Sequence, residues 1–310
     1  MNASRLRALG ATALILAVLP FLLPNNFMLD IAIRIAFAAV AVIGLNLLMG
    51  FAGQISIGHA GFLAIGAYGS AIATSRFGWP PLIAIAAAGI ASAILAWLVA
   101  KPMLRLKGHS LTMATLGFGV IVNIVLINEV AVTGGPDGMA VPPLEVAGLA
   151  LTDLRHWYAG AAIVLWLAIL LSLNLYDSPC GRALRGLHGS EVAARVVGVD
   201  VALFKTRAFV MSAVMASVSG SLTGHYVGFI SPQMASFAHS VELATMVVLG
   251  GMASTFGAVL GSAVLTMLPQ LLGGLHGYES ILFGLILMLT MMFLPRGIVP
   301  TLALKLRRKH

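Results

Sequence analysis

Polar side chains interrupt several otherwise apolar stretches of this sequence, and they are the residues that could make specific contacts there. Along the chain they are Asn46, Gln54, His59 and Asn123. Leaving an amide or an imidazole in hydrocarbon without a partner costs roughly 2–7 kcal/mol. We therefore expect these side chains to face the interior of a helix bundle. They could contact a bound solute there, or they could satisfy backbone groups that a broken helix leaves free.

Glycines accompany these polar residues. Gly53 belongs to a series that recurs between residues 50 and 69, and Gly250 and Gly251 open the stretch 250–257 between two short apolar segments. Small residues let helices approach closely in lipid, and they also permit unwound backbone along a cavity. We interpret 250–257 as a bend that lines a path through the bundle. The residues that could line such a path are therefore Asn46, Gly53, Gln54, His59, Asn123, Gly250 and Gly251.

A few ionisable residues also fall within or beside apolar segments. Arg34 follows Asp30 by four positions, so the two are expected to pair on one helix face. Glu242 stands at the beginning of an apolar segment, where a carboxylate suits the positive end of the helix dipole, so we expect it to cap that helix. Glu129 is expected near the end of its segment. Each of these placements competes with a functional role, which is the default hypothesis for an ionisable residue inside a membrane.

One polar stretch, at 178–200, has the signature of a short exposed helix. Ser190 can cap a helix that begins at Glu191, where an acid suits the dipole. Gly198 can end that helix in a left-handed conformation. A helix of about two turns is thus predicted, of a kind that can dock into a groove on a partner protein.

Recognised catalytic patterns are missing from the sequence. It has no Walker motif for ATP, no His-Glu-x-x-His and no Gly-x-Ser-x-Gly. The eight His residues are scattered, and the single Cys180 cannot form an intrachain disulfide. We therefore predict no catalytic residue, no metal site and no cofactor.

The composition indicates that a lipid bilayer surrounds most of the chain. Of 310 residues, 60% are hydrophobic and 9% are charged. A soluble domain carries about 25% charged residues. The formal net charge of +8 would suggest nucleic-acid binding in a soluble protein, but short basic loops of a membrane protein explain it better. No nucleic-acid partner is expected.

About ten apolar segments are long enough to consider as membrane spans, since a spanning helix needs ~20 residues. The sequence therefore predicts an all-α polytopic bundle of eight to ten spans, some of them short or broken. The segments lie near 8–23, 29–50, 54–75, 80–100, 109–131, 157–175, 206–229, 239–252, 255–272 and 278–294.

The distribution of basic residues predicts the orientation. If both termini are cytoplasmic, only Arg34, Arg76 and Arg155 of the 18 Lys and Arg residues fall outside cytoplasmic pieces. Such sorting follows the positive-inside rule. We therefore expect one membrane domain over 1–310, with a long cytoplasmic loop at 176–205 and an external loop at 134–156.

The predicted cytoplasmic helix carries a family resemblance. Its pattern, Glu191-x-Ala193-Ala194-x-x-x-Gly198, resembles the coupling loop of ABC importer permeases, which contacts the ATPase subunit. This sequence inserts Val192 between the acid and the alanines and lacks the Leu-Pro that follows in the wider class. The resemblance implies an ATPase-coupling role for Arg182, Arg185, Glu191, Ala193, Ala194 and Gly198.

Other strings extend this resemblance over roughly residues 30–300. Together they are similar to the LivM type of permease from branched-chain amino acid importers. They are GLNLLMGFAGQISIGHA at 44–60, TLGFG at 115–119, TGGPDG at 133–138, HYVGFISP at 225–232, VVLGGM at 247–252 and PRG at 295–297.

The resemblance implies a permease subunit in a bacterial inner membrane. Its implied partners are a LivH-type permease, two ABC ATPase subunits and a periplasmic amino-acid-binding protein. Members of the family also move other amino acids, urea or short amides, and those substrates stay open. An autonomous secondary transporter is disfavoured because the acidic residues gather at segment ends and in loops. A scaffold without transport activity is a further alternative.

Overall fold

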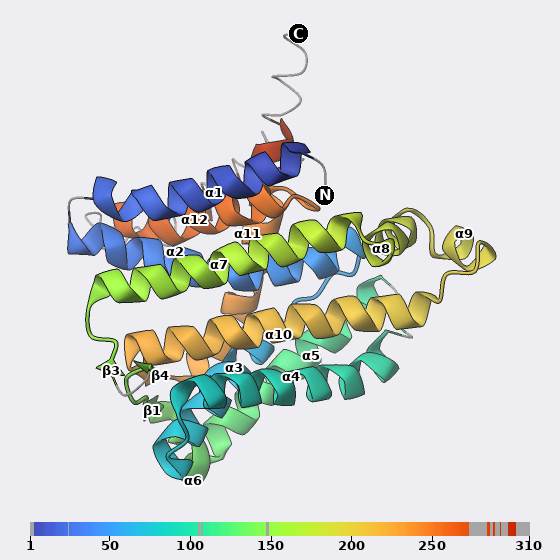
Figure 1. The fold of residues 1–310 in the computed structure, drawn as a ribbon. Coiled ribbons are helices and arrows are strands. Elements are labelled where there is room, and N and C mark those ends of the chain that lie inside the picture. Colours follow the sequence, from blue (N-terminus) through green and yellow to red (C-terminus); the bar gives the residue numbers. More distant parts are fainter. Residues whose placement is uncertain are drawn as a thin grey trace.

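The protein is a bundle of helices, most of them aligned along one direction (Figure 1). The computed structural model describes residues 3–23, 25–104, 106, 108–146, 149–272, 284–285, 288, 292 and 297–301. The apolar segment predicted at 278–294 lies largely outside these residues. The all-α polytopic fold expected from the sequence is confirmed.

The apolar segments of the sequence correspond to helices in the structure. The longer helices are α1 (Ala3–Leu22), α2 (Asn26–Asn46), α3 (His59–Phe77), α4 (Pro81–Met103), α5 (His109–Asn128), α7 (Leu154–Asp177), α10 (Val201–Val227), α11 (Phe237–Gly250) and α12 (Thr255–Leu272). Within the described residues, five are long and apolar enough to cross a membrane: α2 continued to Phe51, α4, α5, α7 and α10. Shorter apolar helices cover Leu9–Leu22, Phe237–Gly250 and Thr255–Gln270.

Side chains that accept hydrogen bonds from the first helical turn fix where several helices begin. Asp153 caps α7, Asp200 caps α10 and Ser236 caps α11, each by accepting a backbone N–H two or three residues ahead. Such caps satisfy amide groups that have no partner inside the helix. At the other end of α10, Gly228 adopts a left-handed conformation with φ of 75°, which terminates the helix at low steric cost.

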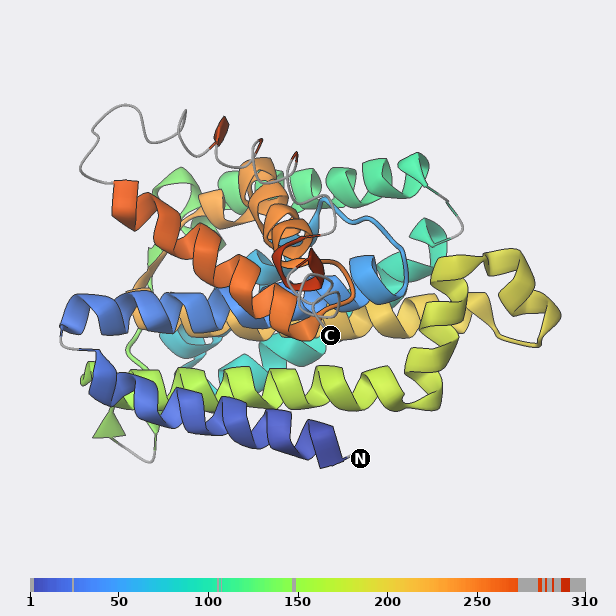
Figure 2. The same cartoon turned by 90° about the horizontal axis from the view of Figure 1, so that it is seen from above.

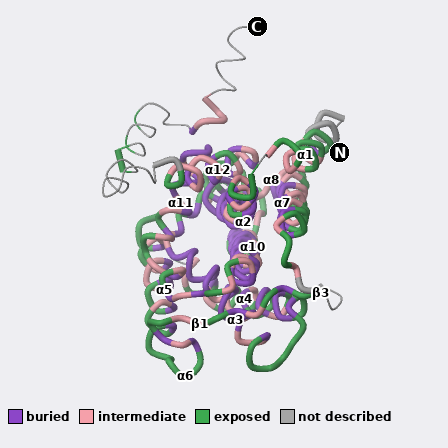
Figure 3. The backbone as a smooth tube through the Cα atoms, turned by 90° about the vertical axis from the view of Figure 1, so that its left-hand side faces the viewer, coloured by how far each residue is buried: buried purple, intermediate pink, exposed green. Residues whose placement is uncertain are grey.

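Helices α2 and α10 form the centre of the bundle, and Figure 3 shows both largely buried. Helix α10 packs against α2, α3 and α4. Serine hydroxyls of α10 reach backbone carbonyls of its neighbours: Ser219 donates to Phe37 O over 2.7 Å, and Ser221 donates to Gly66 O over 2.8 Å. Small hydroxyl-bearing residues let helix backbones come close in lipid, where the hydrophobic effect supplies no association.

The contact between α3 and α10 depends on glycine. A Cβ atom on Gly66 would lie 2.1 Å from the Ser217 carbonyl oxygen, and one on Gly220 would lie 1.9 Å from the Leu63 carbonyl oxygen. Both obstacles are backbone atoms, so a rotamer change cannot relieve them. The two helices must separate if either glycine gains a side chain.

We expect Gly220→Ala to destabilise the fold strongly, by more than the roughly 1–3 kcal/mol of ordinary overpacking, because α10 also packs against α2 and α4 and cannot move away from α3 freely. The matched control is Gly160→Ala in α7, where a Cβ would meet nothing within 4 Å. Thermal unfolding of the detergent-solubilised protein, followed by size-exclusion fluorescence, measures both. Equal midpoints for the two variants would contradict the close packing.

The chain is broken between α2 and α3. Helix α2 passes into a π-helical turn, η1 (Leu47–Phe51), and residues 53–58 have no regular helix. The sequence placed a segment start near residue 54, but α3 begins only at His59. The first residues of that prediction were wrong because Gly53, with φ of 65°, turns the chain out of the helix.

Different structures occupy the two ends of the bundle (Figures 1 and 2). At one end lie α6 (Val130–Thr133), η2 (Gly135–Asp137), η3 (Pro232–Ala235) and two small antiparallel sheets. The strands are β1 (Met139–Ala140), paired with β4 (Phe229–Ile230), and β2 (Glu145–Val146), paired with β3 (Leu149–Ala150). The β1–β4 pair ties the segment predicted as a loop at 134–156 to the end of α10.

At the opposite end lie α8 (Pro179–Gly189) and α9 (Glu191–Val196). The stretch 176–205, predicted as a loop with one short helix, is therefore mostly helical. Helix α8 was missed, and α10 begins inside the predicted loop, at Val201, because Asp200 caps it.

Candidate functional site

Helix α8 is an amphipathic connector at the end of the bundle. Ser178 accepts a hydrogen bond from the Gly181 amide over 3.1 Å, and Pro179 occupies the first turn, where its missing N–H costs nothing. Leu184 and Leu187 are buried, three positions apart. Burial raises the pKa of the Cys180 thiol, and Arg207 acts in the opposite direction. The cap and the proline fix where α8 begins, and the two buried leucines attach it to the bundle.

Helix α9 has the ends that the sequence predicts. The Ser190 hydroxyl accepts from the Ala193 amide over 3.3 Å, and the helix begins at Glu191. Gly198 has φ of 83°. Its amide donates to Arg195 O, and the Val199 amide donates to Ala194 O, which is the paired bonding of a Schellman motif. Both predicted boundaries are confirmed.

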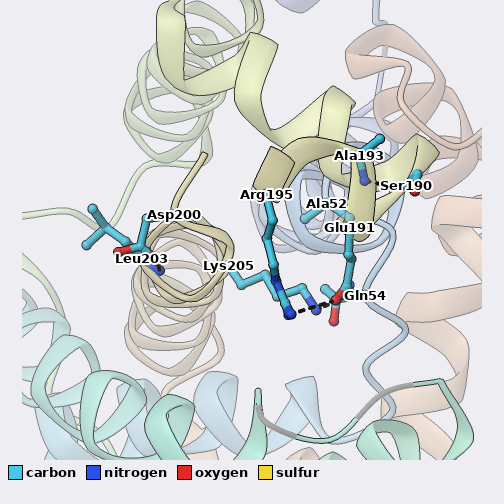
Figure 4. A network of polar contacts seen from close by, with 9 residues as sticks. All are labelled: Ala52, Gln54, Ser190, Glu191, Ala193, Arg195, Asp200, Leu203 and Lys205. Atoms are coloured by element: carbon cyan, nitrogen blue, oxygen red, sulfur yellow. Dashed lines mark hydrogen bonds and ion pairs between the residues drawn. The ribbon is translucent and has the colours of Figure 1, made fainter. Parts of the chain in front are cut away.

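Glu191 is held by an intramolecular ion pair with Lys205 of α10 (Figure 4). The Lys205 residue is only 1% exposed. Arg195 lies 3.9 Å from the other carboxylate oxygen of Glu191, with its own side chain 58% exposed. A buried ammonium requires a partner, because an unpaired charge in low dielectric is very costly. Glu191 therefore ties α9 to α10.

The two arginines proposed for coupling face the end of α7. Arg182 donates to Asp177 O over 2.8 Å, and Arg185 donates to Tyr176 O over 3.3 Å. The Arg185 guanidinium also lies 4.1 Å from the centre of the Tyr176 ring. Cations favour the carbonyl end of a helix dipole. Both side chains thus join α8 to α7 while remaining partly exposed.

The outer face of α9 is apolar and exposed. Val192, Val196 and Val197 are 68%, 83% and 77% exposed, whereas Ala194 on the inner face is buried. Ala193 is exposed as well. We call Val192, Val196 and Val197 the valine face. This face was not predicted, although Val192 departs from the family pattern and the i, i+4 spacing of Val192 and Val196 was a signal for it.

The loop after α2 packs under α8. A Cβ atom on Gly53 would lie 2.8 Å from Nδ1 of His188, so this loop and α8 approach closely. Gln54 is 8% exposed and donates to Ala52 O over 3.1 Å. Figure 4 shows Ala52 and Gln54 together with the Glu191–Lys205 pair. Gly53 and Gln54 therefore belong to the α8–α9 end of the molecule.

The Asn46 side chain stabilises the turn between α11 and α12 with two hydrogen bonds. Its Nδ2 donates to Ser254 O over 3.0 Å, and its Oδ1 accepts from the Ala253 amide over 2.9 Å. Ala253 has φ of 60°, the left-handed region that a residue with a Cβ seldom adopts. The two amide contacts hold this strained residue in place.

Gly250 and Gly251 permit the same turn. A Cβ on Gly250 would lie 1.9 Å from Gly257 O of α12, and Gly251 has φ of 114°. Gly297 packs closely against Gly251: a Cβ atom on Gly297 would lie 2.4 Å from the Cα atom of Gly251. The predicted bend is present, and it is a tight backbone contact.

His59 and Asn123 join the interrupted elements to one another. The His59 Nε2 lies 2.7 Å from the Ser212 hydroxyl of α10, and the Ala60 amide donates to the Ser240 hydroxyl of α11. Asn123 of α5 donates to Pro232 O over 2.8 Å. Each of the four polar candidates thus has a structural hydrogen bond.

A cavity of about 830 Å³ lies elsewhere, between α2, α3, α10, α11 and α12. Ligand sites commonly have volumes of roughly 300–1,000 Å³. None of the seven predicted path residues is among the residues that line it. Its lining is Arg34, Phe37, Ala38, Leu63, Ser219, Thr223, Tyr226, Gln233, Met234, Ser236, Ala238, His239, Glu242, Leu243, Met246, Leu265, Thr266, Pro269 and Gln270.

A second cavity of about 470 Å³ adjoins the first toward the strands, and Arg34 and Tyr226 line both. The expected pair is confirmed: Arg34 Nε donates to Asp30 over 2.8 Å. The Tyr226 hydroxyl also donates to Asp30. These three side chains separate the two cavities.

Glu242 does not cap α11. Ser236 does so, and Glu242 lies in the second turn, 3.1 Å from Nδ1 of His239. The expectation of a capping role was wrong because the helix begins at Phe237, earlier than the apolar pattern indicates.

Long apolar helices, interrupted segments and an open pocket between helices together indicate a multi-pass membrane protein. The chain belongs to the family described as branched-chain amino acid transport system, permease component, whose model matches residues 27–294. This is a family of transport permeases.

Characterised relatives cover nearly the whole chain. The chain is 31% identical to the high-affinity branched-chain amino acid transport permease LivM of Salmonella typhimurium, over 97% of the chain and 76% of the relative. Identity to LivM of Escherichia coli is 32%, over 96% and 76%. Identity to LivH of Salmonella typhimurium is 27%, over 84% and 90%. No solved structure matches the chain.

Proposed function

We propose that this chain is the membrane-spanning permease subunit of an ABC importer that carries branched-chain amino acids across a bacterial inner membrane. The observation that carries the proposal is the similarity to LivM over almost the full chain. The Glu191–Gly198 pattern of α9, which resembles the coupling loop of ABC importer permeases, supports it. The importer comprises a LivH-type permease, two ATPase subunits and a periplasmic amino-acid-binding protein.

The proposed orientation puts both termini and the α8–α9 end in the cytoplasm. The 134–156 region, with its small sheets, then faces the binding protein. The whole of 1–310 forms one membrane domain. In this arrangement α9 presents the valine face to an ATPase groove, an apolar helix-in-groove mode of docking. Helix α10 connects that contact to the cavity, since it carries Lys205 near one end and Tyr226 near the other.

In this proposal the seven predicted path residues act by stabilising the places where the helices are interrupted. Asn46, Gly250 and Gly251 hold the α11–α12 turn, Gly53 and Gln54 hold the loop below α8, and His59 and Asn123 hold the ends of α3 and η3. A movement of α9 is transmitted to these interruptions through the elements that pack against it, α8 and α10, and through the contact of α8 with η1.

Reconstitution tests the proposal directly. Proteoliposomes that contain this permease, its LivH-type partner and both ATPases should accumulate radiolabelled leucine only with ATP and binding protein. An ATPase variant that cannot hydrolyse ATP is the control. Uptake driven by a proton or sodium gradient without ATPases would instead assign a secondary transporter. Uptake of urea or acetamide in place of leucine would assign the other substrate class.

A further inference from the structure

The larger cavity has two opposite charges in a mainly apolar wall. Arg34 enters it from α2, and Glu242 enters it from α11. Phe37, Leu63, Leu243 and Leu265 supply apolar lining. In both Figure 1 and Figure 2, α11 runs across the direction of the long helices. Its second turn, which carries Glu242, lines the cavity.

The Arg34 guanidinium and the Glu242 carboxylate each have polar atoms that can still form a hydrogen bond with a ligand. Arg34 uses Nε for Asp30, and within the described residues its two Nη atoms have no hydrogen-bond partner. Glu242 uses Oε2 for His239, and in the same part of the chain its Oε1 has none. The Arg34 side chain is 45% exposed and that of Glu242 is 34% exposed. Because both residues also line the cavity, both can contact a ligand there.

Helix-end effects do not explain these charges. Arg34 lies eight residues after the start of α2, about 12 Å along the helix axis. Glu242 is not a cap. Ionisable side chains within apolar helices of a membrane protein are costly when they face lipid, so such residues line polar cavities or binding sites.

We infer that this cavity binds a free amino acid as a zwitterion, an inference that rests on the proposed function and deepens it. The Arg34 guanidinium binds the α-carboxylate through its Nη groups, with the fork geometry that suits carboxylates. The Glu242 carboxylate binds the α-ammonium group. The apolar wall takes the side chain. A pair of opposite charges selects against molecules that carry only one of the two groups.

The test uses the purified complex of both permeases with both ATPases, without binding protein. Ligand-induced thermal stabilisation is measured with three probes of similar shape: leucine, leucinamide without a carboxylate, and 4-methylvalerate without an amine. Wild type should respond to leucine at about tenfold or more lower concentration than to either analogue, since each lost charged contact changes affinity by at least that factor.

The variants separate the two roles. Arg34→Gln should lose the preference for leucine over leucinamide, and Glu242→Gln should lose the preference for leucine over 4-methylvalerate. Arg155→Gln and Glu129→Gln, which remove charges outside this cavity, should behave as wild type. Size-exclusion profiles identify any variant that fails to assemble. If Arg34→Gln fails, Arg34→Lys replaces it: this variant keeps the charge but loses the fork, and its preference for leucine over leucinamide should be reduced.

Two outcomes overturn the inference. One is a complex that imports leucine but shows no stabilisation by it. The other is unchanged probe preference in both cavity variants. Failure of the proposed function looks different, because wild-type proteoliposomes would then import no amino acid at all.

Discussion

Replacing Glu191 with Gln should detach α9 from α10 and abolish coupled uptake. The substitution removes the carboxylate that pairs with Lys205, whose side chain is 2% exposed. Removing one partner of a buried ion pair typically costs about 3–5 kcal/mol, because the other charge stays buried without compensation. Glu191 is partly exposed, so we expect a value near the lower end, about 3 kcal/mol.

Arg195 provides the matched control for this prediction. It approaches the same carboxylate at 3.9 Å from an exposed position. Exposed pairs contribute little, so Arg195→Gln should cost below about 0.5 kcal/mol. Thermal unfolding of the solubilised complex, together with leucine-dependent ATPase activity, measures both variants.

A double variant separates the ion pair from a contact with the ATPase. If Glu191 acts by neutralising Lys205, Glu191→Gln combined with Lys205→Met should recover most of the lost stability, since no charge is then left buried. If Glu191 instead contacts the ATPase directly, the double variant would be as defective as the single one. Equal stability of Glu191→Gln and Arg195→Gln would also contradict the role assigned here.

Local sequence signals were sufficient to place most helices and both ends of α9. Ser190 and Gly198 act through their own backbone and that of their immediate neighbours, so their roles could be read from spacing alone. The apolar segment 255–272 coincides with α12 for the same reason. Hydrophobic length and capping are properties of a short stretch of chain.

Contacts between distant segments could not be predicted in this way. The partner of Glu191 depends on how α9 folds back on α10, and the amide of Asn46 reaches a turn some 200 positions later in the chain. The cavity is built by five helices, so no single segment reveals it. Arg34 and Glu242 were visible as intramembrane charges, but their common cavity depends on the crossing of α11.

Helix α8 was missed although it left a signal. Its three glycines lower helix propensity and suggest a linker. However, Ser178 followed by Pro179 marks a helix start, and Leu184 and Leu187 mark a buried face. The tertiary contact of these leucines with the bundle outweighs the cost of the glycines.

Introducing a charge into the valine face should uncouple the transporter without unfolding it. Val196 is 83% exposed, so Val196→Asp removes little buried surface and should leave the unfolding midpoint nearly unchanged. In the proposed complex that face is buried against the ATPase. A buried apolar anchor typically contributes on the order of 2 kcal/mol to binding, which corresponds to about thirtyfold weaker association.

Two controls make the Val196 prediction specific. Val196→Ile keeps the apolar surface and should retain leucine uptake, while Val132→Asp places the same charge at an exposed position at the opposite end of the molecule. Co-purification of the ATPases and ATP-driven uptake should fall only in Val196→Asp. If that variant retains both, the partner binds another surface, and the exposed guanidinium of Arg195 on the same helix becomes the next residue to change. Because Glu191→Gln should lower the unfolding midpoint and Val196→Asp should not, the two substitutions distinguish loss of the inner attachment of α9 from loss of its outer contact.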